Sequence, residues 1–338
     1  MAMTIYDISK KAGVSIATVS RVLNGSENVR PSTRKKVMDV IDKYDYTPNA
    51  FARGMGLHSL KTIGILCADS SDLFLAKAVY FLEQELQANG YESLLCCTGY
   101  NLDIKKNYLN LILSKKVDSI ILVGSHFIGS NEDENQYIKD VSTQVPIMLL
   151  NASFDHPNVY STLCDDYGTM FEAATEMIQS GITDILYLYD SKSYSGLKKL
   201  HGFCDAMKEY NIPGFEKLIH FYDGNIEHLN EVADFVARIA TKGTSFHGIM
   251  TSDDSLAIGS IKYAQKKGIR IPKELSVMGY NNSMLTNCCT PELTSVDNRL
   301  ETLTHQLVQT LLGVLAGEEM PKKSIFSGKI IKRGTTLF

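Results

Sequence analysis

Residues 4–24 read TIYDISKKAGVSIATVSRVLN, and this stretch decides how the N-terminal part of the chain folds. Apolar residues at helical spacing, with Thr4 as the N-cap, predict a first helix. It ends at Gly13, because glycine tolerates the left-handed conformation that a sharp helix exit needs. Ser15 can cap a second helix, which the Asn24-Gly25 pair stops. The sequence therefore predicts two short helices joined by a tight turn.

The second helix has an outward face of small or hydrogen-bonding side chains and one long cation. A helix with such a slim face can lie deep in the DNA major groove, as the second helix of a helix-turn-helix does. An ordinary surface pair of helices is the alternative interpretation. The DNA-contacting residues predicted in this segment are Thr4, Ser15, Ile16, Ala17, Thr18, Ser20, Arg21, Asn24 and Asn28.

A third helix is predicted to begin at Pro31, a residue suited to the first turn. Arg34, Lys35 and Lys36 lie in that turn. Cations near a helix N-terminus oppose the helix dipole, so their position needs another reason. Contacts with DNA phosphates supply one.

The charge distribution agrees with a DNA-binding N-terminus. Residues 1–60 hold nine basic and five acidic residues, a formal charge of +4. The rest of the chain holds 25 basic and 33 acidic residues, a formal charge of −8. The basic end can attract DNA while the acidic body is repelled by phosphates.

The segment YDISKKAGVSIATVSRVLNG, followed by YTPNAFARGM, resembles the DNA-binding domain and hinge of the LacI/GalR (lactose-repressor) family of bacterial transcription regulators. The likeness is dense here and continues, more weakly, through the remaining chain. It implies a helix-turn-helix domain over residues 1–46, a hinge helix and linker over 47–60, and an effector-binding and dimerisation domain over 61–338.

The hinge residues that the resemblance places on DNA are Asn49, Ala52 and Met55. In the family, paired hinge helices enter the minor groove, where an apolar side chain wedges between base pairs; Met55 stands at that position. Pro48 suits the first turn of this helix. A helix of under about two turns is too short to persist alone in water, so we expect it to fold on the operator.

From Lys61 the chain alternates short apolar runs with helical segments. This βα succession predicts an α/β fold with parallel sheets, and its repetition after about residue 160 predicts two similar lobes. The resemblance implies a two-lobed domain like periplasmic sugar-binding proteins. It places the N-lobe over about 61–161 and 292–320, and the C-lobe over about 162–291 and 321–338. The chain is expected to cross between them near 160–163, 283–293 and 318–325.

Polar residues follow many of the predicted strands, where open parallel sheets bind ligands. Short polar residues at strand ends are also ordinary helix caps. The resemblance singles out an effector site made of Phe74, Asn151, Ser195, Lys199, Asp253, Asn281 and Asn298. Several depart from the family pattern: Asn151 and Asn281 stand where members have Asp, and Lys199 replaces Arg. Because Lys offers a point charge instead of a two-donor fork, the effector is expected to be recognised differently.

Other classes of protein find little support. The sequence has no phosphate-binding G-x-x-x-x-G-K-[ST] loop, no G-x-S-x-G elbow and no metal-spaced His or Cys cluster, so no catalytic residue, metal or cofactor is predicted. Seven cysteines without a CxxC pair suggest reduced thiols in the cytoplasm. A transport solute-binding protein is disfavoured by the basic N-terminus and by the lack of a signal-like or membrane-spanning apolar run.

We therefore expect a cytoplasmic, nucleoid-associated homodimeric repressor that binds a palindromic operator and responds to a small polar, carbohydrate-like effector. An alternative keeps DNA binding and changes the input. The Ser-Ile-Ala-Thr segment and KKLHG resemble the catabolite-control branch, whose corepressor is a phosphorylated carrier protein. Docking a phosphoserine favours an Arg-bearing surface, whereas the helix over 72–89 offers Lys77 and no Arg.

Overall fold

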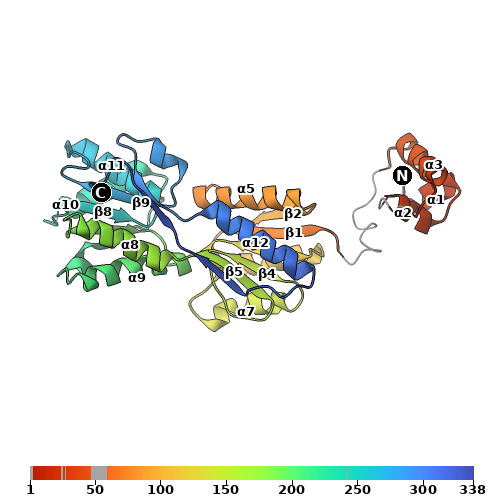
Figure 1. Cartoon of the computed structure of the whole chain (residues 1–338), viewed down its shortest axis with the longest axis horizontal. Helices are drawn as coiled ribbons and strands as arrows, with labels where there is room; N and C mark the ends of the chain where they lie inside the picture. Colours follow the sequence, from red (N-terminus) through yellow and green to blue (C-terminus); the bar gives the residue numbers. More distant parts are fainter. Residues whose placement is uncertain (1–2, 24–25, 27, 47–58, 242) are drawn as a thin grey trace.

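The computed structural model describes residues 3–23, 26, 28–46, 59–241 and 243–338. It contains an N-terminal domain of three helices and an α/β body of two lobes (Figure 1). The predicted fold class is confirmed.

The N-terminal domain consists of α1 (Ile5–Ala12), α2 (Ile16–Leu23) and α3 (Pro31–Lys43). Thr4 and Asp7 form a reciprocal capping box, and Gly13 ends α1 with a φ of 62°. The three helices share one apolar core, whose fully buried members are Ile8, Ala12, Val19 and Val37. This core fixes the orientation of α2 and so determines which of its side chains face outward.

The first lobe has a six-stranded parallel sheet in the order β11-β5-β4-β3-β1-β2. The strands are β1 (Thr62–Cys67), β2 (Glu92–Cys97), β3 (Ser119–Val123), β4 (Ile147–Leu150), β5 (Val159–Cys164) and β11 (Lys323–Phe326). The helices are α5 (Leu73–Ala88), α6 (Leu102–Ser114), α7 (Glu132–Ser142) and α12 (Leu300–Leu315), with a 3-10 turn η1 (Ser125–Phe127). Helices α5 and α12 cover one face of the sheet, and α6 and α7 cover the other.

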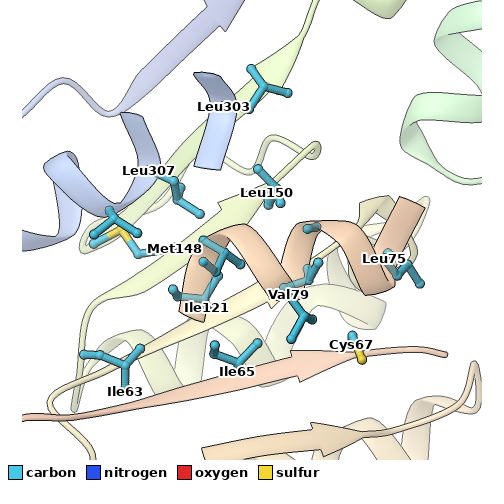
Figure 2. Packing of buried hydrophobic residues seen from close by; sticks show 14 of the residues in the cluster. Ile63, Ile65, Cys67, Leu75, Val79, Ile121, Met148, Leu150, Leu303 and Leu307 are labelled. Atoms are coloured by element: carbon cyan, nitrogen blue, oxygen red, sulfur yellow. The ribbon is translucent and has the colours of Figure 1, made fainter. Parts of the chain in front are cut away.

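Figure 2 shows the core under α5 and α12. Ile63, Ile65 and Cys67 from β1 lie with Leu75 and Val79 of α5 in the same apolar cluster. Leu303 and Leu307 of α12 belong to it as well, although more than 200 residues separate them from β1 in sequence. The C-terminal helix therefore completes the core of the first lobe.

The second lobe repeats this arrangement with a sheet in the order β12-β10-β9-β8-β6-β7, in which only the edge strand β12 is antiparallel to its neighbour. The strands are β6 (Ile185–Tyr189), β7 (Ile219–Phe221), β8 (Gly248–Thr251), β9 (Ser276–Tyr280), β10 (Thr294–Asp297) and β12 (Lys329–Ile331). The helices are α8 (Asp166–Gln179), α9 (Tyr194–Glu209), α10 (Leu229–Thr241) and α11 (Asp254–Lys267), with 3-10 turns η2 (Phe215–Leu218) and η3 (Met284–Asn287). Helices α8 and α9 cover one face, and α10 and α11 the other.

The chain crosses between the lobes further downstream than the sequence predicted. Strand β5 belongs to the first sheet, β10 to the second and β11 to the first. The crossings therefore follow these strands, at residues 165, 298–299 and 327–328, instead of falling near 160–163, 283–293 and 318–325. The expected lobe boundaries are corrected accordingly. The division into a DNA-binding domain, a hinge and linker, and an effector-binding and dimerisation domain stays a prediction.

Candidate DNA-binding surface and inter-lobe cleft

Helix α2 presents most of the predicted contact residues to solvent. Ser15, Ile16, Ala17 and Arg21 are exposed, and Thr18 and Ser20 are half-buried. Ser15 caps the helix as predicted, through a 3.2 Å bond from the Thr18 amide to its hydroxyl oxygen. Val19 and Val22 anchor the opposite side in the core. The outward face is thus held rigidly and is open to a partner.

The structure gives one of the three predicted phosphate contacts another role. The Arg34 guanidinium donates to the carbonyl of Ser26 over 2.6 Å and to that of Val22 over 3.4 Å. It therefore ties α3 to the end of α2 and satisfies carbonyls there, which explains a cation in the first turn without DNA. Lys35 and Lys36 are exposed, and their phosphate contacts stay a prediction.

Four of the predicted DNA-contacting residues, Asn24, Asn49, Ala52 and Met55, lie outside the described residues, as do positions 47–58 of the hinge and linker. Thr4 and Asn28 are exposed. Tyr6 is not among the DNA-contacting residues predicted from the sequence, although its side chain on α1 is 68% exposed. An aromatic side chain so exposed on a short helix is a further candidate for a DNA contact.

The predicted effector residues gather between the lobes, at the carboxyl ends of both sheets. Six of the seven surround one cavity of about 80 Å³: Phe74, Asn151, Ser195, Lys199, Asp253 and Asn281. The seventh, Asn298, lines an adjoining cavity of about 750 Å³. Its side-chain amide donates to Asn281 Oδ1 over 3.0 Å and so orients Asn281, which lines the smaller cavity. Towards solvent the cleft widens into a space of about 950 Å³.

Two direct hydrogen bonds join the lobes at the inner end of this cleft. Ser125 Oγ donates to Ser193 Oγ over 2.8 Å, and Asn151 Nδ2 donates to Ser195 Oγ over 3.3 Å. Each bond connects a turn after a strand of the first sheet with the start of α9. Movement of one lobe against the other would change these contacts.

A buried polar network lies directly behind the cavity. Asp166, only 4% exposed, accepts hydrogen bonds from Ser195 Oγ and, over 2.7 Å, from the Tyr280 hydroxyl. Lys199 Nζ lies 3.9 Å from the centre of the Tyr280 ring and donates to the Ser252 carbonyl over 3.0 Å. Burial raises the pKa of Asp166, an effect that the charge of Lys199 opposes. Asp166 therefore holds the predicted ligand residue Ser195 directly and Tyr280 beside Lys199, although the sequence did not assign this acid to the site.

The cleft also holds carboxylates that the sequence analysis left out of the effector set. Asp72 and Asp190 line the same cavity as Asp253. Asp72 caps α5 by accepting from the Leu75 amide over 2.8 Å. Burial, followed by the charges of Asp190 and Asp254, raises the pKa of Asp253 to about 7. Burial likewise raises the pKa of Asp254 to about 6.

We expect Asp253→Asn to stabilise the α/β body at about pH 8. The pKa of Asp253 is raised from 3.8 to about 7, so between these values the folded protein holds a proton that the unfolded chain has lost. This stabilisation is present below the lower value and disappears as the pH rises through the upper one. The amide is neutral like the protonated acid and can still cap α11 by accepting from the Ser255 amide, but it gives up the acceptor of the 2.8 Å bond from Asn281 Nδ2. We expect a gain of roughly 1–3 kcal/mol at pH 8 and less than half of that gain at pH 5.

Urea unfolding followed by circular dichroism at the two pH values measures this effect. Asp155→Asn removes an exposed carboxylate from a loop and serves as the matched control. A pH dependence in Asp253→Asn equal to that of the control would contradict a raised pKa at this position.

The geometry defines a class of protein: a small basic helical domain carries an exposed recognition helix, and a two-lobed α/β body encloses a polar cleft. This is the organisation of a ligand-responsive DNA-binding regulator. Among the residues described, no helix is long and apolar enough to cross a membrane. The same residues contain no group of three or more His, Cys, Asp or Glu side chains placed to hold a metal ion.

The chain belongs to the LacI family of bacterial regulatory proteins. Residues 4–49 match the description "Bacterial regulatory proteins, lacI family", and residues 174–336 match a periplasmic binding protein-like domain. An HTH-type transcriptional regulator of Lachnoclostridium phytofermentans is 50% identical over 336 residues, which cover 99% of this chain and all of that protein. The resemblance in the N-terminal segment is thereby confirmed, and the chain is a transcription regulator and not an enzyme.

One further relative and one solved structure are also similar to this chain. Catabolite control protein A of Priestia megaterium is 33% identical over 303 residues, covering 88% of this chain and 87% of that protein. The crystal structure of a lac repressor dimer bound to operator and the anti-inducer ONPF superposes with a TM-score of 0.87. It covers the full length of both chains at 21% identity and shows that the fold is shared.

Proposed function

We propose that this regulator is a cytoplasmic, nucleoid-associated repressor that binds a palindromic operator as a homodimer and is controlled by a small carbohydrate-like effector. The observation that carries the proposal is the convergence of six predicted ligand residues, drawn from both lobes, on one cavity. A ligand there would contact both lobes and could change their spacing. A ligand that favours one spacing supplies the differential free energy that an allosteric switch needs.

On the DNA side, the proposal assigns base contacts to α2 and its flanks. Arg21 reads a base edge, and Ile16 and Ala17 set the neighbouring preferences through apolar and size contacts. Thr4, Ser15, Thr18, Ser20, Asn24 and Asn28 make polar contacts around them. The hinge residues Asn49, Ala52 and Met55 contact the minor groove at the operator centre.

On the effector side, the cavity offers amides, hydroxyls, the carboxyl groups of Asp72, Asp190 and Asp253, and one ammonium group, with the Phe74 ring in its lining. Hydroxyl groups of a sugar match such donors and acceptors, and an aromatic ring can cover the apolar face of a pyranose. Because Asn151 and Asn281 replace carboxylates of the family pattern, both can donate as well as accept.

Operator affinity in the presence of a panel of mono- and disaccharides tests this proposal. We expect one structural class of sugar to change the affinity of the protein for its operator by about 5- to 150-fold. Phe74→Ala should lose this response while retaining DNA binding. Lys267→Met, which alters an exposed residue in the last turn of α11, is the control and should respond like the natural protein. A normal dose response in Phe74→Ala would place the site elsewhere.

The second candidate input, a phosphorylated carrier protein as corepressor, is favoured by one arrangement. Helix α5 itself carries no Arg, but Arg299 lines the same 750 Å³ cavity as Lys77 of α5. Two cations beside one groove could hold a phosphoserine. Calorimetry with a phosphorylated and an unphosphorylated carrier protein discriminates this input from a sugar: phosphate-dependent heat supports it, and equal signals oppose it.

A further inference from the structure

The carboxyl ends of β1 and β2 bring two thiols together. Cys67 and Cys97 are direct partners in the register of these parallel strands, and their Sγ atoms lie 3.7 Å apart. Neighbouring strands are about 4.8 Å apart, within the range of Cα separations that a disulfide spans. A small movement of the side chains would therefore allow a bond between the two sulfur atoms.

The two thiols differ in environment. Cys67 is fully buried in the core under α5, whereas Cys97, on the edge strand, is exposed. Burial raises the pKa of the Cys67 thiol to about 12, so it is held protonated. An oxidant from solvent therefore reacts with Cys97 first, and Cys67 is the buried thiol next to it.

The other five cysteines are not arranged in this way. Cys288 and Cys289 are adjacent in sequence, but their thiols donate to the carbonyls of Met284 and Pro291, respectively. Cys164 contacts the hydroxyl of Tyr280, which belongs to the buried polar network around Asp166. All seven cysteines lie in the described part of the chain, and Cys67–Cys97 is the pair whose sulfur atoms are in contact.

We propose that Cys67 and Cys97 form a reversible disulfide when the protein meets a peroxide. The Cys97 thiolate attacks the O–O bond, which breaks, and Cys97 becomes a sulfenic acid while the distal oxygen leaves as hydroxide or alkoxide. The Cys67 sulfur then displaces the sulfenic oxygen as water and transfers its proton to it. In sum, two thiols lose two electrons and two protons, and one hydrogen peroxide becomes two molecules of water.

The bond would lie beside the effector cleft. The Thr98 amide donates to the Cys67 carbonyl over 2.9 Å, and the Gly99 amide to the Ala68 carbonyl over 2.8 Å. The two segments then continue to Asp69 and Tyr100, both of which line the wide part of the cleft. The disulfide would therefore join two segments of one cleft wall covalently, and this oxidation goes beyond the proposed response to a sugar.

Thiol counting on the full-length protein tests the proposal. The reduced protein is treated with hydrogen peroxide, quenched, unfolded and labelled with a maleimide, and the labelled protein and its peptides are weighed by mass spectrometry. We expect two of the seven thiols to be lost, a mass decrease of about 2 Da before labelling, and a peptide pair linked through Cys67 and Cys97. Dithiothreitol should restore all seven thiols.

Two variants make the result specific. Cys97→Ser changes an exposed position on the edge strand, and it should abolish the linked peptide pair. Cys288→Ser removes another exposed thiol and should form the linked pair like the natural protein. The proposal is overturned if peroxide oxidises Cys288 while Cys67 and Cys97 remain labelled, or if the two lost thiols map to another pair.

Discussion

Asp166→Ala is expected to destabilise the α/β body by about 2–6 kcal/mol, because each of the two buried hydroxyls that lose their acceptor costs about 1–3 kcal/mol. Asp166 accepts from Ser195 Oγ and from the Tyr280 hydroxyl, and the charge of Lys199 lowers its pKa against the effect of burial. The alanine variant would leave the hydroxyls of Ser195 and Tyr280 without this acceptor and would remove a carboxyl group that interacts electrostatically with Lys199.

Urea unfolding at neutral pH measures this loss. Asp165→Ala is a matched control, since the neighbouring carboxylate only caps α8 by accepting from the Gly168 amide over 3.0 Å. It should cost about 1 kcal/mol. Asp166→Asn, which keeps the shape and one acceptor, should fall between the two. If Asp166→Ala costs no more than Asp165→Ala, the buried network does not contribute as described.

Arg21→Ala should change which DNA the protein prefers. Arg21 is exposed in the last turn of α2, on the side away from Val19 and Val22. A bidentate contact from Arg to guanine contributes about 1–3 kcal/mol of discrimination between bases. A dimer makes this contact twice, so the variant should lose about 2–6 kcal/mol of discrimination. We expect specificity to relax at one base pair in each half-site.

Lys35→Ala is the matched control for Arg21→Ala. Lys35 is exposed on α3, and a phosphate contact there should weaken binding to every sequence by a similar factor and reduce its salt dependence. Binding competitions between operator variants, at one stated salt concentration, separate the two effects. Uniform weakening by Arg21→Ala would show that this side chain contacts only phosphate.

The elements that could be predicted from the sequence are those with local signals. Thr4 and Gly13 bound α1, and Pro31 starts α3, because caps and glycine exits act within a few residues. Strands β5, β10 and β11, at or next to the segments where the sequence placed the lobe crossings, mix Ser, Thr or Lys with a few apolar residues. They are strands because a neighbouring strand completes their hydrogen bonds, and this tertiary information has no local pattern.

The candidate site likewise contains residues that the sequence identifies and residues that only the tertiary structure brings together. Phe74, Asn151, Lys199 and Asn281 follow from a family resemblance, and the structure brings them around one cavity. The function of Asp166 could not be predicted, because its partners Ser195 and Tyr280 are 29 and 114 residues away. The structure makes Asp165 the N-cap and Asp166 the first residue of α8.

Sequence-specific DNA binding by α2 in a symmetric dimer can be measured by selecting bound fragments from random double-stranded DNA with the full-length protein. The salt concentration should be fixed near the physiological value, because phosphate contacts alone produce tight binding at low salt. We expect a palindromic consensus with two half-sites. Arg21→Ala should reduce the base preference at one symmetric pair of positions in it. Recovery of fragments without a shared sequence, or of a single asymmetric site that Arg21→Ala leaves unchanged, would contradict it.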